Sequence, residues 1–150
     1  MSNWITITKD TLYEARIAIV IDLCDRLLKA DNQADRIPGI IQGRVDHVRR
    51  KISGCRQNRL DADPTKVPKG LRDLTVDLIV ARLKGALEDD LTKDEAENIA
   101  RCERDLNRIA SCDDVVDQPD NAIDAPMEPT TSAPSFGTRV RNFKGSSQNG

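Results

Sequence analysis

The side chains best suited to acid–base chemistry are few and stand apart from one another. His47 is the only histidine, and it lies between Asp46 and Val48 in a stretch flanked by arginines. A solvated or interface histidine is more typical of that setting than a catalytic base. The pair Asp89 and Asp90 follows a predicted helix end, where a solvated turn is the simpler interpretation. The sequence has no Gly-rich phosphate loop and no Gly-x-Ser-x-Gly motif. We therefore expect a protein that is not an enzyme.

The four cysteines are far apart in the sequence, and none belongs to a Cys-x-x-Cys pair. They are Cys24, Cys55, Cys102 and Cys112. This spacing disfavours zinc and dithiol redox sites, so we expect no metal and no cofactor. Cys24 and Cys102 fall on apolar stripes of predicted helices, where a free thiol behaves as a small hydrophobe. Reduced thiols are usual in intracellular proteins, and we expect all four cysteines to be reduced.

The composition favours a helical protein with an aliphatic core. Hydrophobic residues make up 38% of the 150 residues and charged residues 32%, but aromatic residues only 3%. A large β-sandwich with so few aromatic side chains would be unusual. The formal charge of -2 disfavours a globally basic nucleic-acid binder and leaves local patches open. No segment reaches the roughly 18 apolar residues of a membrane span, and the start has no basic region followed by an apolar run. We expect no membrane partner and a protein made in the cytoplasm.

Apolar residues recur at helical spacing in two segments of the N-terminal half. The first helix is expected to follow an N-cap at Thr8 and to end within residues 29–32. The second is expected to have Pro38 in its first turn and Gly54 at its C-terminal cap. Residues 55–66 are polar and predict a loop.

Two further helices are expected in the following part of the chain. The third is expected to open at Val67-Pro68 and is apolar on two faces, which predicts a central position. The fourth begins with a capping box in which Thr92 and Glu95 satisfy each other's backbone donors. Its narrow apolar stripe predicts packing by one face only. The predicted fold class is all-α: a small bundle of about four helices over residues 1–112, with a long extended C-terminal arm over residues 113–150.

The composition changes after Cys112. Acidic residues between 113 and 128 are unopposed by any Lys or Arg, and four prolines interrupt the segment from 119 to 134. Such a segment cannot bury enough apolar surface to offset its ordering entropy. We expect an acidic, Pro-rich spacer followed by a docking arm in which apolar anchors alternate with positive charges. The predicted arm consists of Pro134, Phe136, Arg139, Arg141, Phe143 and Lys144. Docking is favoured over an inert terminus because both phenylalanines of the protein lie here.

A basic cluster lies between residues 44 and 59, where Asp46 is the only acidic residue. The cluster consists of Arg44, Arg49, Arg50, Lys51, Arg56 and Arg59. Three interpretations remain open: an ordinary solvated face, a patch facing an acidic protein neighbour, and a surface near DNA phosphates. No aromatic residues interleave the arginines, so stacking on single-stranded bases has no support.

Three stretches together are typical of one protein family. Residues 4–12 (WITITKDTL) form a short extended start that leads into a helix. Residues 40–54 form a helix rich in Asp and Arg, with Val45, Asp46 and Val48 at its centre. Residues 67–83 form a Pro-initiated central helix. In this order, over about residues 4–110, the chain resembles the head-tail connector proteins of tailed bacteriophages, which are also called adaptor or head-completion proteins.

The resemblance implies a structural protein of the virion, made in the host cytoplasm and placed at the head–tail interface. It implies a homo-oligomeric ring, dodecameric in the family, that sits beneath the portal protein and meets a tail-side connector or tail protein. DNA would pass through the channel without sequence-specific binding. The arm would dock on the portal or on a neighbouring subunit. The alternative is a small helical DNA-binding or packaging protein of a phage that uses the cluster from Arg44 to Arg59.

Overall fold

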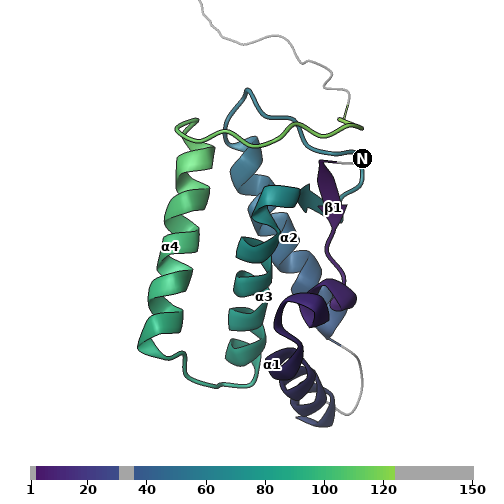
Figure 1. The fold of residues 1–150 in the computed structure, drawn as a ribbon, viewed down its shortest axis with the longest axis vertical. Coiled ribbons are helices and arrows are strands. Elements are labelled where there is room, and N and C mark those ends of the chain that lie inside the picture. Colours follow the sequence, from purple (N-terminus) through teal and green to yellow (C-terminus); the bar gives the residue numbers. More distant parts are fainter. Residues whose placement is uncertain (1–2, 31–35, 124–150) are drawn as a thin grey trace, which may run out of the picture.

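The computed structural model describes residues 3–30 and 36–123, which form a bundle of helices with a small sheet at one end (Figure 1). The elements in chain order are β1 (Trp4–Thr6), α1 (Lys9–Ala30), α2 (Ile37–Ser53), β2 (Lys66–Pro68), the 3-10 turn η1 (Lys69–Leu71), α3 (Arg72–Ala86) and α4 (Lys93–Ala110). The prediction of a mainly helical bundle is confirmed for this part of the chain. The predicted arm residues 134–144 lie outside the described residues.

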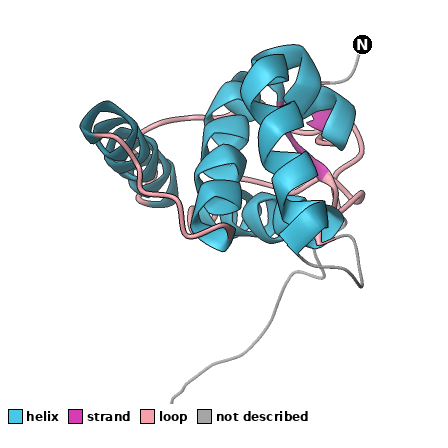
Figure 2. Ribbon diagram, turned by 90° about the horizontal axis from the view of Figure 1, so that it is seen from below, coloured by secondary structure: helices cyan, strands magenta, loops and turns pink. Residues whose placement is uncertain are grey.

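α3 is the central helix of the bundle. It contacts α1, α2 and α4, and Figure 2 shows α4 along one flank of the molecule. α3 buries side chains on two faces, including Val76, Ile79, Val80 and Leu83. The sequence-based prediction of a central third helix is therefore confirmed. α3 is central because its two apolar stripes can both be buried only between other helices. α4 buries only the stripe of Cys102, Leu106 and Ile109, which also agrees with the prediction.

The two short strands correct the all-α prediction. β1 and β2 pair in an antiparallel sheet in which Trp4 faces Pro68 and Ile5 faces Val67. Val67 and Pro68 therefore do not open the third helix, which begins at Arg72 after η1. Pairing with β1 keeps Val67 and Pro68 extended and so overrides the helix-start signal of the proline. Proline is tolerated here because both strands of a two-stranded sheet are edge strands.

Local capping signals in the sequence mark the helix starts correctly. The backbone N–H of Thr11 donates to Thr8 Oγ1 at 3.4 Å, so Thr8 is the N-cap of α1. At α4 the Glu95 N–H donates to Thr92 Oγ1 at 3.2 Å, and the Thr92 N–H donates to Glu95 Oε1 at 2.9 Å. This is the predicted capping box. Pro38 lies in the first turn of α2, also as predicted.

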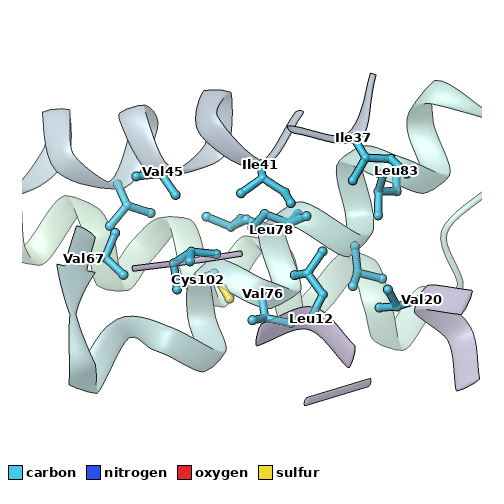
Figure 3. Packing of buried hydrophobic residues seen from close by; sticks show 14 of the residues in the cluster. Leu12, Val20, Ile37, Ile41, Val45, Val67, Val76, Leu78, Leu83 and Cys102 are labelled. Atoms are coloured by element: carbon cyan, nitrogen blue, oxygen red, sulfur yellow. The ribbon is translucent and has the colours of Figure 1, made fainter. Parts of the chain in front are cut away.

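The core is aliphatic apart from one tryptophan. Figure 3 shows α2 residues Ile37, Ile41 and Val45 packed toward Leu78 and Leu83 of α3. All five side chains are buried. Trp4 is buried as well, with 1% of its surface exposed. The free thiols of Cys24 and Cys102 lie in the same core, which confirms the prediction for those two cysteines.

The prediction of four reduced cysteines is wrong for the other two. Cys55 and Cys112 form a disulfide with a Cα–Cα distance of 5.2 Å. The bond joins the ends of α2 and α4, which come together at Gly54 because its missing side chain lets Ala110 approach. A Cβ placed at Gly54 would lie 3.1 Å from the Ala110 Cβ atom. The pairing was not foreseen because only the packing of α2 on α4 brings these two distant cysteines together.

Candidate functional site

The basic cluster is continuous in the sequence but does not lie wholly on the surface. Its members occupy two elements: α2 carries Arg44, Arg49, Arg50 and Lys51, and the loop after α2 carries Arg56 and Arg59. Arg50, Arg56 and Arg59 are exposed. Arg44 and Lys51 are half-buried, and Arg49 is buried. The structure thus separates three exposed cations from three that are partly or fully buried.

Arg49 has to be removed from the candidate contact surface. Its guanidinium donates to the carbonyl oxygens of Lys66 and Asp61, both at 2.8 Å. It also lies 5.6 Å from the centre of the Trp4 ring, within cation–π range. Burial lowers the pKa of Arg49, an effect that the nearby carboxylate of Asp61 opposes. Arg49 therefore ties α2 to β2 and to the loop before it, and it is not part of the exposed surface. Its position four residues from the buried Val45 is the signal that could have shown this.

Two polar side chains of α2 contact α4. Lys51 Nζ donates to Asn107 Oδ1 at 2.6 Å. His47 Nε2 lies 2.8 Å from Glu103 Oε1, and only 17% of the histidine side chain is exposed. His47 is thus part of a contact between α2 and α4.

The Asp89–Asp90 pair is not a simple solvated turn. Both guanidinium nitrogens of Arg26 reach the Asp89 carboxylate, at 2.8 and 2.9 Å. The hydrogen bond from Arg26 lowers the pKa of Asp89 below its usual value. The ion pair between Arg26 and Asp89 joins α1 to the connection between α3 and α4. Asp90 is exposed. Sequence reasoning missed this ion pair because its partners are far apart along the chain.

Residues 112–123 lie across the end of the bundle where α2 and α4 finish, as the light-green loop in Figure 1 shows. The disulfide holds the start of this 112–123 segment. Further along, Trp4 Nε1 donates to the carbonyl oxygen of Asp117 at 2.7 Å. The Ala62 N–H then donates to the carbonyl oxygen of Asn121 at 2.8 Å, and the Ile123 N–H to that of Leu60 at 2.9 Å. The first part of the predicted spacer is therefore fastened to the body.

Two of the hollows on the bundle are lined by charged residues. A basic hollow of about 460 Å³ is bordered by three arginines and two glycines. Its arginines are Arg36, Arg44 and Arg82, and its glycines are Gly39 and Gly43. Only Arg44 belongs to the predicted cluster, because Arg36 precedes α2 and Arg82 lies on α3.

The second hollow, of about 540 Å³, is bordered by acidic and apolar residues beside the 112–123 segment. Its acidic members are Asp105, Asp114 and Asp117. Val115 also borders it and is 90% exposed. The side chain of Asp114 pairs with Arg108 at 3.1 Å. The structure therefore places an acidic surface and a basic surface on one body, and the sequence pattern did not show this arrangement.

Within the described ranges, the structure places no group of three or more His, Cys, Asp or Glu side chains where they could hold a metal ion. No helix in those ranges is both long and apolar enough to cross a membrane. Comparisons of the chain with protein-family models, curated proteins and solved structures found no match. The arrangement of the described residues is thus the basis for a functional proposal.

Proposed function

We propose that this protein is a structural adaptor of a tailed bacteriophage, which joins the capsid portal to the tail. In this proposal the helical body forms a ring beneath the portal, and the C-terminal arm docks on the portal or on a neighbouring subunit. The sequence resemblance over about residues 4–110 suggests the family, and the geometry of the C-terminal segment suggests how an arm would be used.

The observation that carries the proposal is the fastening of the 112–123 segment across one end of the bundle. Both ends of the segment are held. The disulfide holds Cys112, and the Ile123 N–H donates to the carbonyl oxygen of Leu60. The described chain therefore ends at Ile123, at a point that is fixed to the body. A fixed starting point raises the effective concentration of a docking sequence near its site, as for any tethered ligand.

Phe136, Arg139, Arg141 and Phe143 are the proposed anchors of the arm. Aromatic and arginine side chains contribute most of the binding energy in many protein interfaces. A portal or subunit groove that accepts them would need apolar pockets with acidic residues between, because the phenylalanines alternate with positive charges.

Deletion of residues 133–150 tests this function. The truncated protein keeps the described core and is expected to fold, because every hydrogen bond and buried side chain named above lies before residue 124. It is expected to be lost from portal-containing particles, with incorporation measured by quantitative mass spectrometry of purified particles. Removal of residues 146–150 alone serves as the matched control, since that deletion spares all the proposed anchors. Equal incorporation of both truncated chains would remove the docking role.

The alternative function, DNA binding by the basic cluster, keeps some support because Arg50, Arg56 and Arg59 are exposed. It predicts binding to duplex DNA that weakens steeply with salt, since phosphate contacts release counterions. Fluorescence anisotropy with a labelled duplex measures this affinity. Unchanged affinity after replacement of these three arginines by glutamine would eliminate the alternative.

A further inference from the structure

The basic hollow has the form of a receiving site. Arg36, Gly39, Gly43 and Arg44 lie on one face of the start of α2, and Arg82 of α3 forms another part of the border. Apart from its chain neighbours and the nearby backbone of α2 itself, a Cβ placed at Gly39 or at Gly43 has no atom within 4 Å. Another chain can thus approach the α2 backbone closely in the space between the arginine side chains. The half-buried Ile40 supplies an apolar part of the lining.

The 112–123 segment presents a feature of the opposite charge. Asp113, Asp114 and Asp117 surround Val115, whose exposed fraction of 90% is the largest among the exposed large hydrophobic residues of the described chain. We call residues 113–117 the acidic loop. Exposure of a single valine is common, but here it projects from a run of aspartates that is held in place.

The acidic loop is fixed to the body and is not a free end. The N–H groups of Asp113 and Asp114 donate to the carbonyl oxygen of Arg108 at 2.8 and 3.2 Å. Trp4 holds the carbonyl oxygen of Asp117, and the disulfide holds the preceding residue, Cys112. Because its backbone is already ordered, the loop would lose little conformational entropy on binding.

The acidic loop and the basic hollow lie at opposite ends of α2. Gly54 packs on Ala110, directly before the acidic loop, whereas the hollow lies around Gly39. At a helical rise of about 1.5 Å per residue, Gly39 and Gly54 are about 22 Å apart. The two features cannot meet within one folded chain, but they can meet between two copies.

We infer that the acidic loop of one copy docks in the basic hollow of a second copy, so that the protein associates head to tail. Opposite charges would set the orientation, and Val115 would enter the part of the hollow that Ile40 lines. A contact between two different surfaces repeats until it closes as a ring or extends as a filament. It would be the subunit contact of the ring in the proposed function, and to that extent it rests on that proposal.

Three proteins test this contact in isolation: the full-length chain and two variants with one altered surface each. The hollow variant carries Arg44→Gln and Arg82→Gln, and the loop variant carries Asp113→Asn, Val115→Ser and Asp117→Asn. These side chains are exposed or half-buried, so both variants are expected to fold, which circular dichroism and thermal melting check. Sedimentation velocity and native mass spectrometry at low salt then give the distribution of assemblies.

The unaltered chain is expected to form assemblies larger than a dimer, and each variant alone is expected to associate at least about tenfold more weakly. An equimolar mixture of the two variants is expected to stop at the heterodimer. In that pair one intact loop meets one intact hollow, and the other two surfaces are both altered. Matched controls carry the same kinds of change elsewhere: Arg56→Gln with Arg59→Gln, and Asp90→Asn with Glu97→Gln. Both control proteins should assemble as the unaltered chain does.

Three outcomes would overturn the inference. They are an unaltered chain that stays monomeric at every concentration and salt, variants that assemble normally, and a hollow variant that loses only duplex DNA binding. The last result would make the hollow a phosphate-binding site. This test uses the isolated protein, whereas the test of the adaptor function uses phage particles. Self-association can therefore be observed even if the particle experiment contradicts the adaptor function. The adaptor function can likewise hold if self-association is not observed.

Discussion

Arg49 shows at the scale of one residue how a charge can belong to the core. It stands within a run of basic residues, yet its guanidinium satisfies two backbone carbonyls and covers an indole ring. Only 6% of the residue is exposed. Removal of a buried cation of this kind leaves its acceptors without a donor.

Replacement of Arg49 by methionine keeps much of the side chain's bulk and removes both hydrogen bonds. We expect the free energy of unfolding to fall by about 2–4 kcal/mol, because the carbonyl oxygens of Asp61 and Lys66 lose a charged donor. Denaturant titration measures the change. Arg50→Met is the matched control, as Arg50 is exposed on the same helix, and its effect should stay within about 0.5 kcal/mol. Similar effects of the two substitutions would contradict the assigned role.

Glu95 makes stability depend on pH at the start of α4. Its carboxylate accepts a hydrogen bond from Lys84 and another from the Thr92 N–H, and together these lower its pKa from 4.5 to about 2. A lowered pKa in the folded state stabilises the fold at pH values above the unfolded value of about 4.5. That contribution is lost as the pH falls from about 4.5 toward 2.

We therefore expect Glu95→Gln to lower the melting temperature at pH 7. As the pH falls toward 2, the melting temperature of the variant should approach that of the unaltered protein. The amide can still fill the capping box, so the difference reports the lost charge. Melting curves across this pH range measure it, and Glu97→Gln, an exposed site on the same helix, is the control. A constant difference between the Glu95 variant and the unaltered protein at all pH values would exclude this explanation.

At the scale of elements, the disulfide is the main covalent constraint that the structure adds to the helices. Cys55 and Cys112 are separated by 57 residues, and the closed loop contains β2, α3 and α4. A cross-link over such a loop restricts the unfolded chain and is typically worth about 2–4 kcal/mol.

Reduction of the disulfide is thus expected to lower the free energy of unfolding by about 2–4 kcal/mol. Denaturant titrations with and without dithiothreitol measure the loss. Cys112→Ser should match the reduced protein and should show no further response to dithiothreitol, because its other cysteines are free thiols. Insensitivity of the unaltered protein to the reductant would count against the bond.

The elements that sequence reasoning predicted best are those whose signals are local. Thr8, Pro38 and the Thr92–Glu95 box mark three helix starts correctly, since each acts within one turn of its own helix. The strand pair was missed because Val67 adopts an extended form only against Ile5, a distant partner. The same reason explains the disulfide, the inward position of Arg49 and the hollow that combines Arg44 with Arg82. The sequence shows which residues are charged, but the packing of the helices decides which of these residues share a surface.

At the scale of the whole molecule, the body has two unlike ends. The end where α2 and α4 finish carries the disulfide, the sheet and the acidic loop, whereas the start of α2 carries the basic hollow. In the proposed head-to-tail association, this polarity would give every copy the same orientation. The 112–123 segment, which precedes the proposed arm, is fastened at one of these ends.

Trp4 gives this end of the molecule an optical signal of its own. It is the only tryptophan, its ring is buried against Arg49, and its Nε1 atom donates to the 112–123 segment. Detachment of that segment would expose the indole to water and shift its fluorescence emission to longer wavelength. The protein thus contains an unlabelled reporter beside its proposed docking loop, and the reporter can follow both the opening of the segment and its coverage by another copy in real time.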